Sequence, residues 1–318
     1  MHVISAGELR SVLHYRMLIE RLRQGFRAGC ALPPAQRYVL PGCTDQDTRL
    51  TLRPAWVAGR HIGVMVEATV PDNSRRDLPV TTGCYLLLDG KTGTALAVLD
   101  AKALITQRTA AAAALAASYL ARPDASRLLV LGTGTLAAHL IEAYAVALPI
   151  RQVLIWGRDP AKAERIAGRF RRGAVRVSAT TDLEGAVRGA EIIASATAAT
   201  RPVLRGDWLE PGVHIDLIGS TSPEAREADD EVIRRGRIFV DSRERALLEA
   251  GDLVQPLAAG LLAPGDIAGD LFDLARGERS GRRFYDQITV CKAVGCALED
   301  LIAAELAVEM AIHNETLR

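Results

Sequence analysis

The stretch LLVLGTGTLA, residues 128–137, decides the fold of this chain. Its leading apolar residues predict a buried strand, and the pattern G-x-G-x-x-A follows where a helix is expected to begin. Gly132 allows a tight turn, Gly134 lets the backbone approach a pyrophosphate, and Ala137 keeps the helix close to the strand. N–H groups at a helix start also favour phosphate. We predict a dinucleotide site, rather than a turn without ligand, at Gly132, Thr133, Gly134, Thr135, Leu136 and Ala137.

Outward from this stretch, short apolar runs alternate with helical segments. Such runs suit strands that are buried on both faces of a parallel sheet. They predict an α/β fold with a doubly wound parallel sheet. Before the sheet lie an alternating strand at residues 61–70 and a helix from about Thr106, and a final helix is expected from about Thr289. The six predicted sheet strands are residues 128–131, 153–156, 175–177, 191–194, 213–218 and 238–240.

Composition excludes several classes of protein. The 318 residues are 49% hydrophobic, with a net charge of +1, which argues against a disordered chain and a nucleic-acid-binding surface. At roughly 150 residues per domain, about two domains are expected. No uncharged stretch approaches the ~20 residues of a membrane span, and the N-terminus lacks a signal-peptide pattern. Cysteines and histidines show no metal-ligand spacing. We expect a cytoplasmic protein with no metal, nucleic-acid partner or membrane segment.

The cofactor type depends on the end of the second strand, WGRD at residues 156–159. An acid there binds the 2′-hydroxyl of NAD, whereas an arginine accommodates the 2′-phosphate of NADP. We assign Gly157 and Arg158 to the cofactor, because Asp159 before Pro160 is better explained as the cap of the next helix. This favours NADP(H) over NAD(H). In the alternative, Arg158 points into solvent and Asp159 binds the ribose.

A second informative stretch is ITQRTAA, residues 105–111. Arg108 is expected in the first turn of its helix, where the helix dipole and the guanidinium both favour an anion. A carboxylate matches the fork of arginine donors. The alternative is an arginine that only packs at the surface.

Several long stretches resemble the ornithine cyclodeaminase/mu-crystallin family. They are LLLDGKTGTALAVLDAKALITQRTAAAAALAASYLA, LLVLGTGTLAAHL, WGRDPAKAERIA, PGVHIDLIGSTSPEAREAD, DSRERALLEAGDL and ITVCKAVGCALED. The resemblance implies a Rossmann domain at residues 119–299. It also implies an N-terminal α/β domain for homodimerisation and substrate binding, made of residues 1–118 with 300–318. Hydride would move between a nicotinamide and the α-carbon of an amino or imino acid, with Arg108 and Arg37 binding the substrate carboxylate.

The chain departs from the family pattern at several positions, among them Ala293, where many members have a serine. Met65 stands where the family usually has a lysine, and none of the four lysines, Lys91, Lys102, Lys162 and Lys292, is near it in sequence. A thioether cannot replace an ammonium. The family's M-P-A is here R-P-A, so we hypothesise that Arg53 supplies the missing charge; otherwise the site has one cation fewer. Thr221 stands where ornithine cyclodeaminases carry an acid, and a threonine has no useful pKa as a base.

These departures favour the ketimine-reductase branch of the family. The leading interpretation is NAD(P)H-dependent reduction of a small α-imino acid similar to Δ1-pyrroline-2-carboxylate, because an iminium arrives electrophilic and needs mainly orientation. Ornithine cyclodeaminase, which forms proline and ammonia, or an amino-acid dehydrogenase is the alternative within the class. An NADPH-binding protein with little catalysis is the alternative from another class. Further cofactor contacts are predicted at Thr109, Thr197, Ala198, Ile218, Gly219 and Val290.

Overall fold

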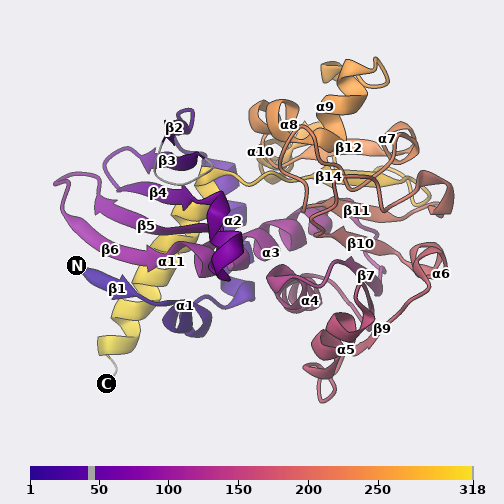
Figure 1. The fold of residues 1–318 in the computed structure, drawn as a ribbon, viewed down its shortest axis with the longest axis horizontal. Coiled ribbons are helices and arrows are strands. Elements are labelled where there is room, and N and C mark those ends of the chain that lie inside the picture. Colours follow the sequence, from indigo (N-terminus) through magenta and orange to yellow (C-terminus); the bar gives the residue numbers. More distant parts are fainter. Residues whose placement is uncertain (42–46, 317–318) are drawn as a thin grey trace. The chain divides into compact units, whose positions relative to one another are not determined.

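The computed structural model describes residues 1–41 and 47–316. It divides into two compact units, Met1–Thr109 with Cys296–Arg318 and Ala110–Gly295. The domain breaks expected after residues 118 and 299 fall inside two uninterrupted helices, α3 (Ala101–Leu120) and α11 (Ala297–Thr316). Figure 1 shows the elements of both units. No helix of the described part is long and apolar enough to cross a membrane.

The second unit contains the predicted doubly wound parallel sheet. Its strand order is β13-β12-β14-β11-β10-β7-β8-β9. The order reverses direction at β7 and β10, and folds of this kind bind ligands at such a switch point. All six predicted strands are confirmed, as β7 (Arg127–Leu131), β8 (Gln152–Trp156), β9 (Arg176–Ala179), β10 (Ile192–Ser195), β11 (His214–Leu217) and β12 (Arg237–Val240).

Two more strands complete this sheet, and one of them corrects a sequence prediction. β14 (Thr289–Lys292) lies between β11 and β12, and β13 (Gly269–Asp270) pairs with β12 at the edge. The final helix was expected from about Thr289, but α11 begins at Ala297. Thr289 and Val290 are β-branched and favour a strand. Gly295 has a positive φ of 85°, which turns the chain between the strand and the helix.

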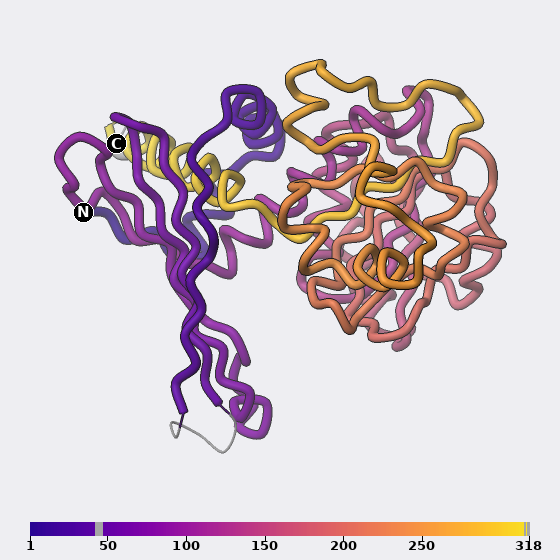
Figure 2. The backbone as a smooth tube through the Cα atoms, turned by 90° about the horizontal axis from the view of Figure 1, so that it is seen from above, coloured from indigo at the N-terminus to yellow at the C-terminus, as the bar shows by residue number. Residues whose placement is uncertain are grey.

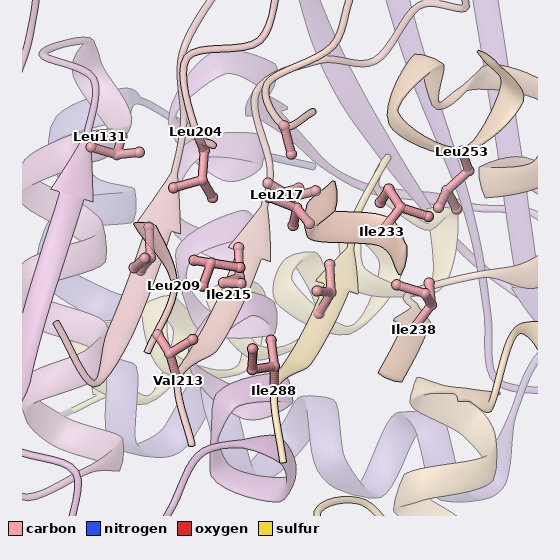
Figure 3. Close-up of a cluster of buried hydrophobic side chains, with 14 of the residues drawn as sticks. Leu131, Leu204, Leu209, Val213, Ile215, Leu217, Ile233, Ile238, Leu253 and Ile288 are labelled. Atoms are coloured by element: carbon pink, nitrogen blue, oxygen red, sulfur yellow. The ribbon is translucent and has the colours of Figure 1, made fainter. Parts of the chain in front are cut away.

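Helices cover the faces of this sheet and close its core. Figure 3 shows the cluster in which Leu217 and Ile215 of β11 pack with Ile233 of α7 and Leu253 of α9. Burying a leucine or isoleucine side chain contributes roughly 1.5–3 kcal/mol. The helices are α4 (Thr135–Ala147), α5 (Pro160–Gly168), α6 (Leu183–Gly189), α7 (Asp230–Arg235), α8 (Arg243–Glu249), α9 (Gly251–Ala258) and α10 (Leu271–Arg276).

The first unit is a six-stranded sheet with order β1-β6-β5-β4-β3-β2. β1 pairs in parallel with β6, and the other pairs are antiparallel. Figure 2 shows the long strands of this unit continuing together as an arm. Its strands are β1 (His2–Ile4), β2 (Gln36–Leu40), β3 (Thr48–Val57), β4 (His61–Thr69), β5 (Thr81–Asp89) and β6 (Ala95–Asp100).

The two faces of the six-stranded sheet differ. Helix α11 runs along one face, above the buried Met65 and Tyr85, and α1 (Ala6–Val12) and α2 (Tyr15–Ala28) pack beside it. Gly25 lets α2 approach α11 closely, because a Cβ there would lie 2.7 Å from Cγ1 of Ile302. The opposite face is apolar and only half-buried, with side chains from Leu52, Pro54, Ile62, Val64, Val66, Leu86, Leu88 and Val98.

Candidate functional site

A cavity of ≈ 810 Å³ lies in the second unit at the carboxyl ends of β7, β8 and β10. It brings together half of the predicted cofactor residues: Gly132, Thr133, Gly134, Gly157, Arg158, Thr197 and Ala198. We call it the dinucleotide pocket. The loop that follows β10 supplies much of its remaining wall, with Ala196, Ala199, Thr200, Arg201, Pro202 and Val203.

The glycine loop has the geometry that its sequence predicts. Gly132 has φ of 113°, and a Cβ there would lie 2.4 Å from the carbonyl oxygen of Ala196. Gly134 caps α4, and a Cβ at this position would meet open space, so a ligand can approach its backbone. Thr135, Leu136 and Ala137 form the first turn of α4, where Ala137 is buried. This loop fits the phosphates of a dinucleotide.

Three cationic side chains line the pocket, and two of them follow β8. Asp159 caps α5, because its Oδ1 accepts a hydrogen bond of 3.0 Å from the N–H of Ala161. This confirms the predicted cap. Arg158 is exposed and lines the pocket together with Lys162 and Arg201. Sequence reasoning missed these last two, although Lys162 lies four positions after Arg158 at the start of α5.

The other predicted cofactor residues lie elsewhere. The lining of the pocket, within the described part of the chain, does not include Thr109, Ile218, Gly219 or Val290. Ile218 is buried, and Gly219 follows β11 directly beside the carbonyl oxygen of Thr197. Val290 belongs to the hydrophobic cluster, so its side chain packs in the core. Thr109 is half-buried in the first unit.

In the first unit, Arg108 is buried in an ionic cluster. Its Nε donates to Asp300 Oδ1 at 2.8 Å, and its Nη1 donates to Glu299 Oε2 at 2.6 Å. Arg108 and both acids are at least nine-tenths buried. The two carboxylates fix the plane of the guanidinium. Sequence reasoning missed them, although two adjacent acids in the first turn of α11 were a signal.

The expected helix-dipole effect on Arg108 is wrong. Helix α3 begins at Ala101, so Arg108 lies in its third turn. Asp100 precedes the helix and accepts a hydrogen bond from the N–H of Ala103. Because the dipole acts within the first turn, the environment of Arg108 comes from Glu299 and Asp300 instead.

Arg53 and Met65 stand directly opposite each other on β3 and β4. Met65 is fully buried, and the Arg53 side chain is 17% exposed. Arg53 Nη2 lies 2.5 Å from Oε2 of Glu67, two residues beyond Met65 on the same face. The Arg53 guanidinium therefore lies beside Met65, and its ion pair with Glu67 partly neutralises its positive charge.

Polar residues flank Arg53 and Met65 on the neighbouring strands β2 and β5. Exposed Arg37 of β2 pairs with Thr51, which pairs with Glu67, so all three lie in one row across the sheet. Tyr85 pairs with Met65 on the other side. Burial raises the pKa of Tyr85 well above its usual value, and the nearby carboxylate of Asp300 raises it further. The first unit thus brings Arg37, Arg53 and Met65 together, while Thr221 is an exposed residue of the second unit.

Comparison with known proteins identifies the family. Residues 6–315 match the ornithine cyclodeaminase/mu-crystallin family. The chain belongs to this family. A Δ1-pyrroline-2-carboxylate reductase of Paracoccus denitrificans is 39% identical over 303 residues, which are 95% of this chain and 94% of the relative. The resemblance seen in the sequence is therefore confirmed.

Two solved structures of family-like proteins share the fold over almost their whole length. One is Thermococcus litoralis Δ1-pyrroline-2-carboxylate reductase in complex with NADH and L-proline, with a TM-score of 0.91, 28% identity and coverage of 99% of this chain and 98% of that chain. The other is an archaeal alanine dehydrogenase dimer with bound NAD, with a TM-score of 0.90, 25% identity and coverage of 99% and 97%.

Among the described residues, no group of three or more histidines, cysteines and acids could hold a metal ion. Three groups of described residues are candidates for the chemistry of this family member: the dinucleotide pocket, the Arg108 cluster and the face that carries Arg53 and Met65.

Proposed function

We propose that this protein is an NAD(P)H-dependent reductase of small α-imino acids, with a cyclic ketimine such as Δ1-pyrroline-2-carboxylate as substrate. One observation carries the proposal: the first unit holds a buried, oriented arginine, and the second holds a pocket built for a dinucleotide. An imino acid offers a carboxylate to the arginine and an electrophilic carbon to hydride. The 39% identical Paracoccus denitrificans reductase supports this choice of substrate.

Arg108 orients the substrate in this proposal. A guanidinium has five N–H donors in a rigid fork, and here Glu299 and Asp300 hold its plane. We assign the substrate carboxylate to the same guanidinium. A nicotinamide dinucleotide held at Gly132, Gly134 and Arg158 would supply a hydride to the α-carbon of the protonated imine, which would become a neutral amine. Because the iminium already carries its proton, Met65 does not need to supply one.

Reduction is better supported than the reverse chemistry on amines. Oxidising an amino acid requires a base to take up a proton. Thr221 cannot act as that base, and it stands where ornithine cyclodeaminases have an acid. The archaeal alanine dehydrogenase neighbour keeps amino-acid dehydrogenation as the second candidate.

One assay separates these functions. Purified protein is mixed with NADPH or NADH and a panel of cyclic and linear α-imino acids, and nicotinamide absorbance is followed. In parallel, ornithine and alanine are tested with NADP⁺ and NAD⁺. We expect rapid oxidation of the reduced cofactor with cyclic ketimines and no proline from ornithine. Faster turnover of ornithine or alanine than of any imine contradicts the proposal.

We also propose that NADPH is preferred over NADH. Asp159 is occupied as the cap of α5, and Arg158, Lys162 and Arg201 line the same pocket. Cationic side chains can bind the 2′-phosphate of NADPH. Asp159 already caps α5, so we do not assign it to the 2′-hydroxyl of NADH. We expect Arg158→Ala to weaken NADPH binding about tenfold and to change NADH binding little, whereas the matched change Arg165→Ala, at an exposed position of α5, should change neither. Tighter NADH binding by the native protein rejects this preference.

We further propose that two copies pair through the half-buried apolar face of the six-stranded sheet. A patch of this kind marks an interaction surface, and the archaeal alanine dehydrogenase neighbour is a dimer. Trp56, 38% exposed, lies on the same face as Val64 of β4. Light scattering should give twice the chain mass for the native protein and a monomer for Val64→Lys. A native monomer at every concentration contradicts the pairing.

A further inference from the structure

The second unit buries an ionic network beside the ends of β10, β11 and β14. Its members are Glu227, Asp252 and Lys292, each with 0% of its surface exposed. They come from three of the stretches that resemble the family, and the proposed reaction uses none of them. Charged groups are rarely buried completely unless they are paired and hydrogen-bonded. Their partners therefore indicate what the network does.

The Glu227 carboxylate joins two loops. Its Oε1 accepts hydrogen bonds from Ser195 Oγ at 2.7 Å, from Thr197 N at 2.7 Å and from Thr197 Oγ1 at 2.8 Å, all at the end of β10. Its Oε2 accepts from Gly219 N at 2.6 Å and Ser220 N at 3.3 Å, after β11. Each oxygen thus serves one loop.

The first of these loops is a wall of the dinucleotide pocket. Residues 196–203 line it, beginning immediately at the Glu227 contacts. The carbonyl oxygen of Ala196 also lies against Gly132, where a Cβ would approach to 2.4 Å. A shift of Thr197 would therefore move the surface against which the glycine loop packs.

The second loop is held equally closely. A Cβ on Gly219 would lie 2.0 Å from the carbonyl oxygen of Thr197 and 2.7 Å from Glu227 Oε1. The two loops are in direct contact, and Glu227 lies where they meet. Its five donors are arranged for an acceptor without hydrogens, which is an ionised carboxylate.

Asp252 contacts the backbone of Glu227, and Lys292 in turn contacts Asp252. Asp252 Oδ1 accepts from the N–H groups of Glu227 and Ala228, at 2.8 and 3.0 Å. Lys292 Nζ lies 3.1 Å from Asp252 Oδ2. Burial raises the pKa of Glu227 and the nearby Asp252 charge adds to this rise, whereas the Lys292 ammonium and the hydrogen bonds from Ser195 and Thr197 act to lower it. The lysine thus helps to keep the carboxylate charged.

We propose that Glu227 is a positioning residue for the cofactor: its carboxylate holds the loops after β10 and β11 at the separation that NAD(P)H binding needs, with Lys292 and Asp252 as its support. The inference rests on the proposed function only in that the pocket binds a nicotinamide dinucleotide. It makes no use of the identity of the imino acid.

The test compares Glu227→Gln with Glu224→Gln. Glu224 lies three residues earlier on the same segment and is exposed, so it is a matched control. A glutamine at 227 turns an N–H₂ group toward N–H and O–H donors of one loop. We expect the dissociation constant for NADPH, from nicotinamide fluorescence, to rise about tenfold. The kcat at saturating NADPH should fall less than threefold, and the control should match the native protein.

A purely structural role would give a different result. In that case Glu227→Gln would lower the melting temperature but leave NADPH affinity within about twofold of native at temperatures where the variant is folded, and this would overturn the proposal. Should Glu227→Gln fail to fold, Ser195→Ala removes one donor and leaves the carboxylate in place. It should weaken NADPH binding about threefold, and unchanged binding again overturns the proposal.

The measurement also separates this proposal from the proposed function. The readout is cofactor binding, so a native protein that binds NADPH but reduces no imine would reject the reductase and still test Glu227. A native protein that binds neither NADPH nor NADH would overturn both.

Discussion

In the first unit Arg108 binds Glu299 and Asp300, and in the second unit Lys292 stands against Asp252 beside Glu227. Each cluster therefore buries one cation with two carboxylates. In the first, the acids hold the arginine, and the arginine is the group we assign to substrate. In the second, the lysine and Asp252 support Glu227, and Glu227 holds the loops.

The two cations suit these opposite roles. A guanidinium is planar and directional, so separate acids on Nε and Nη1 fix the direction in which it faces a ligand. An ammonium is a compact point charge, which compensates a nearby carboxylate without imposing a direction. The comparison predicts that changes in the first unit act on the substrate, whereas changes in the second act on stability and on the cofactor.

The largest effect is expected from Lys292→Met. This change leaves Glu227 and Asp252 buried without their cation and should destabilise the protein by about 3–5 kcal/mol in urea unfolding. Lys91→Met, in an exposed turn, is the control and should be neutral. A loss below 1 kcal/mol would mean that the network does not depend on its lysine.

The same variant should show a characteristic pH dependence. Burial already raises the pKa of Glu227, and removing the Lys292 charge raises it further. A carboxyl whose folded-state pKa lies above its unfolded value stabilises the fold at low pH and loses that contribution as the pH rises. The stability difference between Lys292→Met and native protein should therefore shrink on acidification. A difference that widens on acidification contradicts this assignment.

Arg108→Lys comes next and probes the first unit. Lysine keeps the charge but loses the fork held by Glu299 and Asp300. We expect kcat/KM for the imino acid to fall about 100-fold, which is about 2.7 kcal/mol, while the dissociation constant of NADPH stays within twofold. Lys102→Met, exposed on the same helix, should match native protein. Equal losses of substrate and cofactor binding would break the division of roles.

The sequence predicts features that are set by neighbouring residues, but not contacts between residues that lie far apart in the chain. The strands, the turn at Gly132 and the cap at Asp159 each depend on a few consecutive residues, and the structure has all of them. The partners of Arg108 could not be predicted in this way, since Glu299 is 191 positions away. Strand β14 was missed because TVCK is short and a helical segment follows it closely.

The same distinction explains the role of the lysines. None of the four lysines is near Met65 in sequence, and composition alone does not place them in the fold. In the fold, Lys292 lies buried at the end of β14, and Lys162 lines the dinucleotide pocket. The role of neither lysine follows from its distance to Met65 in the sequence.

The smallest effect is expected from Arg53→Met, which tests a third ion pair. Arg53 and Glu67 are 17% and 15% exposed, so water screens them more than either buried cluster. If Arg53 supplies the charge that Met65 lacks, its loss should raise the KM for the imino acid about threefold to tenfold, a change of about 1 kcal/mol. Glu67→Gln removes the partner but keeps the cation, so its KM should stay near native. An unchanged KM in Arg53→Met would show that this site works with one cation fewer and that Arg53 does not replace the charge that Met65 lacks.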